Sequence, residues 1–150
     1  VECYRELAAK QPGIFEPDLA AALVNLGRVT GQLRMLPPAI NHCREAVRMF
    51  ERLAKSHHGV HDPAHAAALG ALAEVLIFAG QREEASDCYY HAVDALSAVF
   101  HRRLAHYAPL MATLVTGYVK SCEALQNRPA NELLAPIDAV IVNMLQKREG

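Results

Sequence analysis

Tryptophan is absent from this 150-residue sequence, and aromatic residues make up only 6% of it. The chain therefore offers few side chains on which nucleotide bases stack. Its net charge of −1 at pH 7 gives no electrostatic reason to expect nucleic acid or an anionic membrane surface as a partner. The most apolar stretch, residues 66–80, is too short to span a bilayer and contains Glu74. We expect neither a nucleic-acid nor a membrane partner.

Closely spaced cysteines are absent as well. The four cysteines, Cys3, Cys43, Cys88 and Cys122, lie 40, 45 and 34 residues apart, which is not the spacing of a zinc or haem site. It is typical of reduced, partly buried thiols in a cytoplasmic protein, and this is the location we predict. We expect no secretory signal sequence. It begins without Met and with a helical pattern, so we expect it to be a fragment of a longer protein.

Common catalytic signatures are also missing. The sequence has no GxSxG, HExxH or GxGxxG motif and no phosphate-binding loop. Apolar residues make up 52% and charged residues 21% of the chain, as in a soluble globular domain. We therefore expect a single folded domain that is not an enzyme and that needs no cofactor.

The sequence does contain an internal repeat with a period of 46 residues. Residues 4–27, YRELAAKQPGIFEPDLAAALVNLG, align without a gap on residues 50–73, FERLAKSHHGVHDPAHAAALGALA. The identities fall on small and apolar residues, as expected of a structural repeat. The matched pairs include Leu7 and Leu53, Gly13 and Gly59, Pro17 and Pro63, Leu23 and Leu69, Ala39 and Ala85, and Ala46 and Ala92.

Each unit reads as two helices joined by a turn, because apolar residues recur at helical spacing. In the second unit Asp62 is the expected N-cap, Pro63 lies in the first turn, and Gly80 ends the helix. In the first unit the second helix begins at Pro37 and Pro38. No segment alternates as a strand does, so we expect no sheet. The inner face of the second unit's second helix is predicted to be Ala85, Tyr89, Ala92, Leu96 and Val99.

The two ends of the chain follow this pattern less closely. Residues 1–10 are predicted to end an earlier helix, and Gly13 and Pro17 to form the same turn as Gly59 and Pro63. After the second unit we expect two more helices, with the linker QNRP (126–129) replacing the glycine-centred turn. Their inward residues are predicted to be Met111, Leu114 and Tyr118, then Leu133, Ile137, Val140, Ile141 and Met144.

The helix pairs resemble the tetratricopeptide repeat (TPR). The resemblance is carried by Leu26-Gly27 and Leu72-Ala73 in the first helices, and by Ala39, Ala46, Ala85 and Ala92 where the two helices of a unit cross. Tyr89 matches the aromatic residue that the family places between the two alanines, whereas Cys43 departs from it. The period is longer than the usual length of about 34 residues. It is similar to the longer repeats of kinesin light chains and of many bacterial and fungal TPR arrays.

The resemblance implies an all-α fold of about seven antiparallel helices, stacked as helix pairs into a right-handed superhelical solenoid. It also implies four divisions of one domain. These are the end of a preceding repeat and a turn (residues 1–17), a first repeat (18–62), a second repeat (63–104), and a degenerate third repeat or capping helices (105–150).

In TPR arrays the first helix of each unit lines a concave groove that binds a peptide or helix of another protein. The resemblance therefore implies non-catalytic protein binding. Asn25 matches an asparagine with which similar repeats hold a peptide backbone, although Ala71 stands at the equivalent position of the second unit. The outward residues of the first helices, and so the candidate partner-binding residues, are Asn25, Arg28, Gln32, Glu74, Ile77, Phe78, Thr113, Thr116 and Lys120.

A second hypothesis belongs to a different functional class. The chain is then a structural, oligomerising or sensor segment of a larger multidomain signalling protein. Bacterial and fungal nucleotide-binding receptors use similar repeats in this way, so the hypothesis rests on analogy of fold. Self-association of the isolated chain would favour it.

The histidine-rich stretch KSHHGVHDPAH (55–65) is the remaining candidate for chemistry. Imidazole binds borderline divalent metals, and the candidate ligands are His57, His58, His61 and His65. One unit earlier the corresponding residues are Gln11, Pro12, Phe15 and Leu19. The repeat therefore does not require histidine here. We predict solvated histidines and no metal site, with a weak metal site as the alternative.

Overall fold

The computed structural model describes residues 1–57 and 59–146, and all regular structure in this part of the chain is helical. The expected all-α fold is confirmed for these residues. Prolines lie in the first turns of the second, third and fourth helices, where a missing N–H leaves no bond unmade. The described helices are α1 (Glu2–Lys10), α2 (Pro12–Gln32), α3 (Leu36–Ser56), α4 (Asp62–Phe78), α5 (Arg82–Phe100), α6 (Leu104–Ala124) and α7 (Asn131–Gln146).

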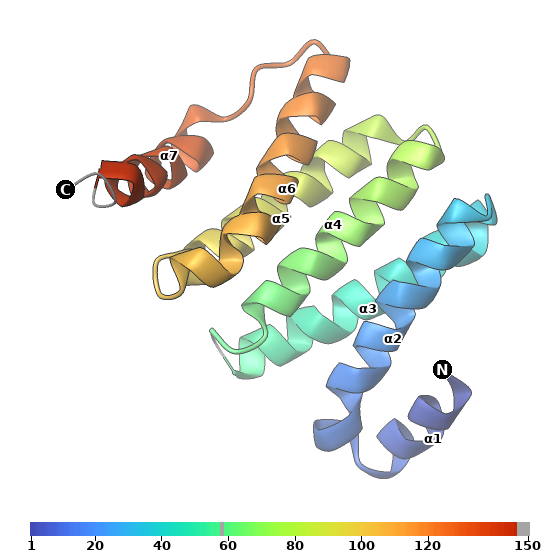
Figure 1. Ribbon diagram of the computed structural model, residues 1–150. Helices are drawn as coiled ribbons and strands as arrows, with labels where there is room; N and C mark the ends of the chain where they lie inside the picture. The colour runs from blue at the N-terminus through green and yellow to red at the C-terminus, as the bar shows by residue number, and fades with distance from the viewer. Residues whose placement is uncertain (58, 147–150) are drawn as a thin grey trace.

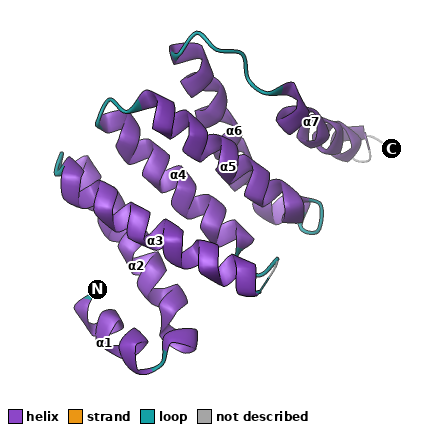
Figure 2. Ribbon diagram, turned by 180° about the vertical axis from the view of Figure 1, so that it is seen from behind, coloured by secondary structure: helices purple, strands orange, loops and turns teal. Residues whose placement is uncertain are grey.

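The helices form two layers. Figure 1 shows α2, α4 and α6 side by side and parallel, and Figure 2 shows α3 and α5 on the opposite side. Each helix from α2 to α5 packs on the next one along the chain, and α4 also packs on both α2 and α6. The short α1 packs on α2, and α7 contacts α5.

Three turns at one edge of the molecule share the same backbone geometry (Figure 1). Arg34, Gly80 and Gln126 have positive φ angles of 61°, 78° and 57° and lie 46 residues apart. In each turn the next N–H donates to a carbonyl five residues earlier at 2.9 Å, as Gln81 does to Leu76. This is the Schellman type of helix termination. The linker QNRP was expected to replace this turn, but Gln126 keeps it.

The turn predicted at Gly13 and Pro17 is wrong. Helix α1 ends at Lys10 and α2 begins at Pro12, so Gly13 and Pro17 both lie inside α2. In the second unit Gly59 has a φ of 83°, and its N–H donates to the Asp62 carboxylate at 2.7 Å. The residue equivalent to Asp62 is Glu16, whose carboxylate instead pairs with Arg52 of α3. Without an acceptor for the turn, the first unit continues as helix.

Asp62 was also predicted to be the N-cap of α4, and this too is wrong by one residue. His61 stands at the N-cap without a side-chain hydrogen bond, and Asp62 is the first residue of the helix. Its carboxylate is occupied by the Gly59 N–H rather than by an N–H of α4. The acidic side chain still lies in the first helical turn, where the helix dipole favours negative charge.

The core runs between the two layers and depends on small residues. Ala39, Ala46, Ala85 and Ala92 are fully buried, as expected of positions where two helices cross closely. The predicted inner face of α5, from Ala85 to Val99, is buried as well. Met111, Leu114 and Tyr118 of α6 are buried, as are Leu133 and Ile137 of α7. Val140 is half-buried, and the side chains of Ile141 and Met144 lie outside the described part of the structure.

Candidate functional site

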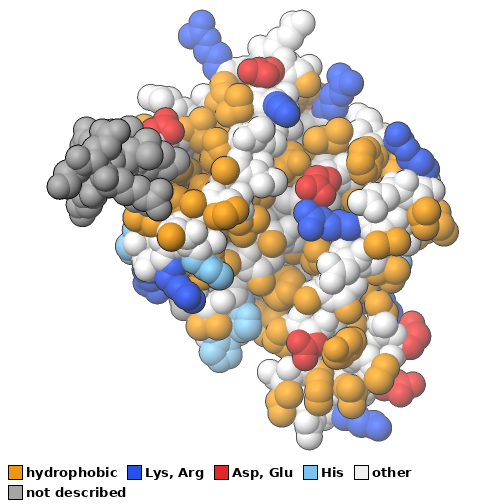
Figure 3. Space-filling view, viewed as in Figure 1, with side chains coloured by type: hydrophobic (Ala, Val, Ile, Leu, Met, Phe, Trp, Pro, Cys, Tyr) orange, Lys and Arg blue, Asp and Glu red, His pale blue; other side chains and the backbone are white. Residues whose placement is uncertain are grey.

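The exposed residues of α2, α4 and α6 form one face of the molecule, which we call the front face (Figure 3). Hydrophobic and uncharged side chains cover most of it in this view, and charged groups are scattered. The residues predicted to bind a partner all lie on these three helices. Asn25, Arg28, Gln32, Ile77, Phe78, Thr113, Thr116 and Lys120 are exposed, and Glu74 is half-buried.

Two predicted contact residues pair with each other. Arg28 of α2 donates from Nε and Nη2 to the two carboxylate oxygens of Glu74 on α4, both at 3.3 Å. The two residues are separated by one repeat period, so they occupy equivalent positions on neighbouring helices. Their side chains are 48% and 39% exposed, and an ion pair in contact with solvent contributes little to stability. It places a fixed, overall neutral polar group in the middle of the front face.

Three buried groups of α3 and α5 are held in their neutral forms. Burial raises the pKa of the Cys43 thiol to about 11, with smaller opposing effects from Arg28 and Glu74. Burial also raises the pKa of Cys88 to about 11 and that of Tyr89 to about 12. A thiol is nucleophilic only as its thiolate. Near neutral pH, Cys43 and Cys88 are packing groups rather than reactive ones.

An apolar groove opens at the C-terminal end of the front face. Its volume is about 320 Å³, and it is lined by Ile77 of α4, Arg82 of α5, and Lys120, Ser121 and Ala124 of α6. Ile77 is 42% exposed despite its size. The groove therefore joins an exposed aliphatic side chain to two cations that form no ion pair with any described residue.

Phe78 follows Ile77 at the end of α4 and is not part of the groove lining. Its side chain is 45% exposed, and the guanidinium carbon of Arg34 lies 5.2 Å from its ring centroid. An arginine over an aromatic face is attracted by the ring electrons. Arg34 comes from the turn after α2 and Phe78 from α4, so this contact joins the ends of two neighbouring helices. It also leaves one edge of the ring open to solvent.

The structure separates other predicted residues from this end of the face. Thr113 donates to the Pro109 carbonyl of its own helix at 3.0 Å. Thr116 lines a different cavity, of about 160 Å³, together with Ile137 and Asp138 of α7. Asn25 is exposed, but its equivalent Ala71 is fully buried because α4 lies between α2 and α6. An asparagine ladder across the three helices is therefore excluded by packing.

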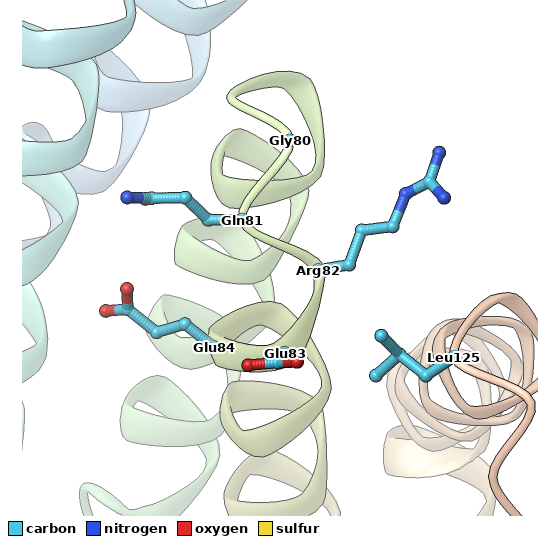
Figure 4. A pocket seen from close by; sticks show the side chains of 6 residues that line it. All are labelled: Gly80, Gln81, Arg82, Glu83, Glu84 and Leu125. Carbon is cyan, nitrogen blue, oxygen red and sulfur yellow. The ribbon is translucent and has the colours of Figure 1, made fainter.

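A cavity of about 460 Å³ lies at the turn between α4 and α5 (Figure 4). Arg82 points toward Leu125 at the end of α6, whereas Gln81 and Glu84 point to the opposite side. Glu84 is already paired with Arg44 of α3 at 2.6 Å. Most residues that line this cavity belong to the exposed turn between α4 and α5. Arg82 lines both this cavity and the neighbouring apolar groove.

The histidines of the stretch KSHHGVHDPAH do not gather at one point. The rings of His57 and His61 meet edge to face with centroids 6.0 Å apart. His65 is half-buried in α4, and burial lowers its pKa. His58 lies outside the described residues. Within residues 1–57 and 59–146, no group of three or more His, Cys, Asp or Glu side chains is arranged to hold a metal ion.

Sequence reasoning missed several residues of the apolar groove. Arg82, Ser121 and Ala124 were not among the predicted contacts, although they line the groove with Ile77 and Lys120. Gly80, the turn glycine, was the sequence signal from which the position of Arg82 could have been predicted. A helix that begins two residues after Gly80 must place Arg82 next to the end of α4. Ser121 was not predicted because its position in α6 belongs to the buried side of the helix. Its hydroxyl donates to the Gly117 carbonyl of the same helix.

Comparison with known proteins adds no relative. No family model matches the chain, and neither a curated protein nor a solved structure matches it. Among the described helices, none combines the length and the apolar character needed to cross a membrane. A functional interpretation therefore rests on the repeat pattern of the sequence and on the geometry of the described residues.

Proposed function

We propose that this chain is a non-catalytic, protein-binding module of the TPR type, with its helix pairs wound into a right-handed superhelix. The front face is then the concave surface, and it binds a peptide or a helix of a partner protein. The sequence resemblance supports this proposal through the crossing alanines. The equivalent turns at Arg34, Gly80 and Gln126 support it through the repeat of backbone geometry.

The exposure of Ile77 and Phe78 is the observation that carries the proposal. Both are large apolar side chains at the end of α4. Ile77 lines a groove of about 320 Å³, and Phe78 lies against Arg34 of the turn after α2. Adjacent exposed apolar groups with a polar rim mark interaction surfaces more often than isolated ones do. The rim is supplied by the Arg28–Glu74 pair and by Lys120.

The surface fits a short segment with an apolar anchor. An aliphatic or aromatic side chain of the partner enters the groove against Ile77 and Ala124, because the groove wall there is apolar. The ring of Phe78 extends this contact, and aromatic residues dominate the binding energy of many interfaces. Lys120 and Arg82 favour a partner segment without positive charge next to its anchor.

Selection from a displayed peptide library tests this proposal. Peptides enriched on the unmodified chain should lose about tenfold or more in affinity for Ile77→Ala or Phe78→Ala, as expected when an anchor contact is removed. Val60→Ala is the matched control, because Val60 is 68% exposed and lies in the turn before α4. Peptides that bind all three variants equally well would place the binding surface elsewhere.

The ion pair allows a second test. Arg28→Glu should weaken peptide binding, because it sets two carboxylates side by side in the middle of the face. Combining it with Glu74→Arg restores an ion pair in the reversed direction. If binding recovers in the double variant, the pair acts by keeping this part of the face neutral. Light scattering over a range of concentrations checks the competing hypothesis of an oligomerising segment, which requires self-association.

A further inference from the structure

A second groove lies on the opposite side of the molecule from the front face. We call it the rear groove. It is bounded by α3 and α5 with α4 between them (Figure 2), and its volume is about 360 Å³. Val47 and the buried Leu69 provide its apolar surface. Its ionisable lining residues are Glu51 of α3, His65 of α4, and His91 and Asp94 of α5.

The charge of the rear groove is negative near neutral pH. Asp94 is exposed and forms no ion pair with any described residue. Glu51 accepts a hydrogen bond from Lys55 at 2.8 Å, and this contact lowers the pKa of its carboxyl group. His65 stays neutral at pH 7, because burial lowers its pKa below the ordinary value. Two carboxylates from opposite walls thus line one space, and Lys55 is paired with only one of them, Glu51.

The equivalent positions one repeat earlier show what fills such a space. There Arg5 of α1 and Glu45 of α3 form an ion pair at 2.9 Å. One period later Arg5 becomes Glu51 and Glu45 becomes His91. The first position has changed from a cation to an anion. An ion pair joins α1 and α3 at these positions in the first unit. In the second unit Glu51 and His91 stand there instead, and the ion pair that joins α3 to α5 is formed by Arg44 and Glu84, which do not line the rear groove.

We propose that the rear groove binds an arginine side chain presented by a partner protein. The aliphatic stem lies against Val47 and Leu69, since arginine covers apolar surface with its methylene groups. The guanidinium lies between Glu51 and Asp94, where it donates charge-assisted hydrogen bonds to both carboxylates. The partner's guanidinium then joins α3 to α5, as the guanidinium of Arg5 joins α1 to α3 one unit earlier. This binding site does not depend on the front face.

Protonation opposes this binding. His65 and His91 face the same groove, and acidification gives His65 a positive charge once the pH falls below its lowered pKa. The other charged groups near His65 are Glu51 and Lys55 of α3 and Asp62 of α4. A bound guanidinium excludes further positive charge, so the affinity for arginine should fall from about pH 7 to about pH 5.

Nuclear magnetic resonance titration of the chain tests the proposal, with N-acetyl-arginine methylamide as the probe. N-acetyl-citrulline methylamide has nearly the same shape and no charge, and serves as the matched ligand. The arginine probe should produce saturable shifts in the signals of His65, His91 and Leu69, and the citrulline probe should not. An equal response to both probes would overturn the proposal, as would the absence of any saturable response to arginine.

Variants on a single helix locate the site. Asp94→Asn should weaken arginine binding about two- to fivefold, the range for one solvent-exposed charge pair. Asp87→Asn is the control, because Asp87 is an exposed carboxylate on α5 outside the groove. Lys55→Gln should strengthen binding, because it releases Glu51 from its present partner. Equal losses for Asp94→Asn and Asp87→Asn would show only unspecific attraction to a negative surface.

Discussion

The tight packing of α2 against α3 at Gly27 allows the effect of Gly27→Ala to be predicted. Gly27 lies in α2 and faces α3. A Cβ atom built there falls far inside contact distance of the Cys43 sulfur and lies 3.2 Å from the carbonyl oxygen of Ala39. Cys43 is fully buried, so its side chain has no free space into which to turn. The substitution therefore forces α2 and α3 apart.

Two opposing effects set the magnitude. Overpacking of a core by one methyl group costs about 1–3 kcal/mol, whereas alanine is favoured over glycine within a helix by about 1 kcal/mol. Gly13 separates the two effects, because a Cβ built there meets nothing within 4 Å. Gly13→Ala should therefore raise the free energy of unfolding. The free energy of unfolding of Gly27→Ala should be lower than that of Gly13→Ala by about 1–3 kcal/mol.

Removing the sulfur tests the cause. Cys43→Ala deletes one buried heavy atom and should cost about 0.5–1.5 kcal/mol, as Ile→Val does. In that background the new methyl group of Gly27→Ala occupies the space that the sulfur has left. The double variant should then be more stable than the sum of the single effects predicts, with a coupling of about 0.5–3 kcal/mol.

Urea unfolding followed by far-ultraviolet circular dichroism measures the unmodified chain and the four variants, since the chain has no tryptophan for fluorescence. The reasoning is refuted if Gly27→Ala is as stable as Gly13→Ala. It is also refuted if the effects of Gly27→Ala and Cys43→Ala add within experimental error.

Two further predictions concern the turns and the buried thiols. Gln126→Gly should stabilise the chain by about 0.5–1 kcal/mol, because a glycine adopts the positive φ without strain, and Gly80→Ala should destabilise it by at least as much; urea midpoints that move in the opposite directions would contradict the shared turn geometry. The pKa values of Cys43 and Cys88 are raised to about 11 in the folded chain, so the folded state holds these protons more tightly than the unfolded state does. Their contribution to stability is therefore complete below about pH 9 and is lost as the pH rises toward about 11. The fall in the urea midpoint over this range should be smaller in a Cys43→Ala, Cys88→Ala double variant, and an unchanged slope would assign the fall to other groups.

Helical periodicity and the repeat register were enough to predict the helices and most of the core. The inner face of α5 was read from spacing alone, because residues three and four apart share one side of a helix. The turn geometry was only partly predictable. Gly80 signals a left-handed residue, whereas Arg34 and Gln126 adopt the same geometry without that signal.

Residues whose partners lie on distant helices were not predictable from local pattern. Asp62 read as a helix cap, but its carboxylate bonds to Gly59. Gly13 read as a turn, but Glu16 pairs with Arg52 and the helix continues. Arg28 and Glu74 were both predicted as outward residues, and only the structure shows that they bind each other. The rear groove was missed because its charges come from three helices.

The recurrence of one turn at Arg34, Gly80 and Gln126 has a consequence for the loss or gain of a whole repeat. The segment between two of these residues begins and ends in the same backbone conformation. Deleting or duplicating residues 35–80 therefore joins ends that already match, and the helices on either side keep their directions. Side chains, rather than the main chain, then limit such exchange. With residues 35–80 removed, Gly27 would face Tyr89 in place of Cys43, so each helix pair carries its own complement of large and small residues.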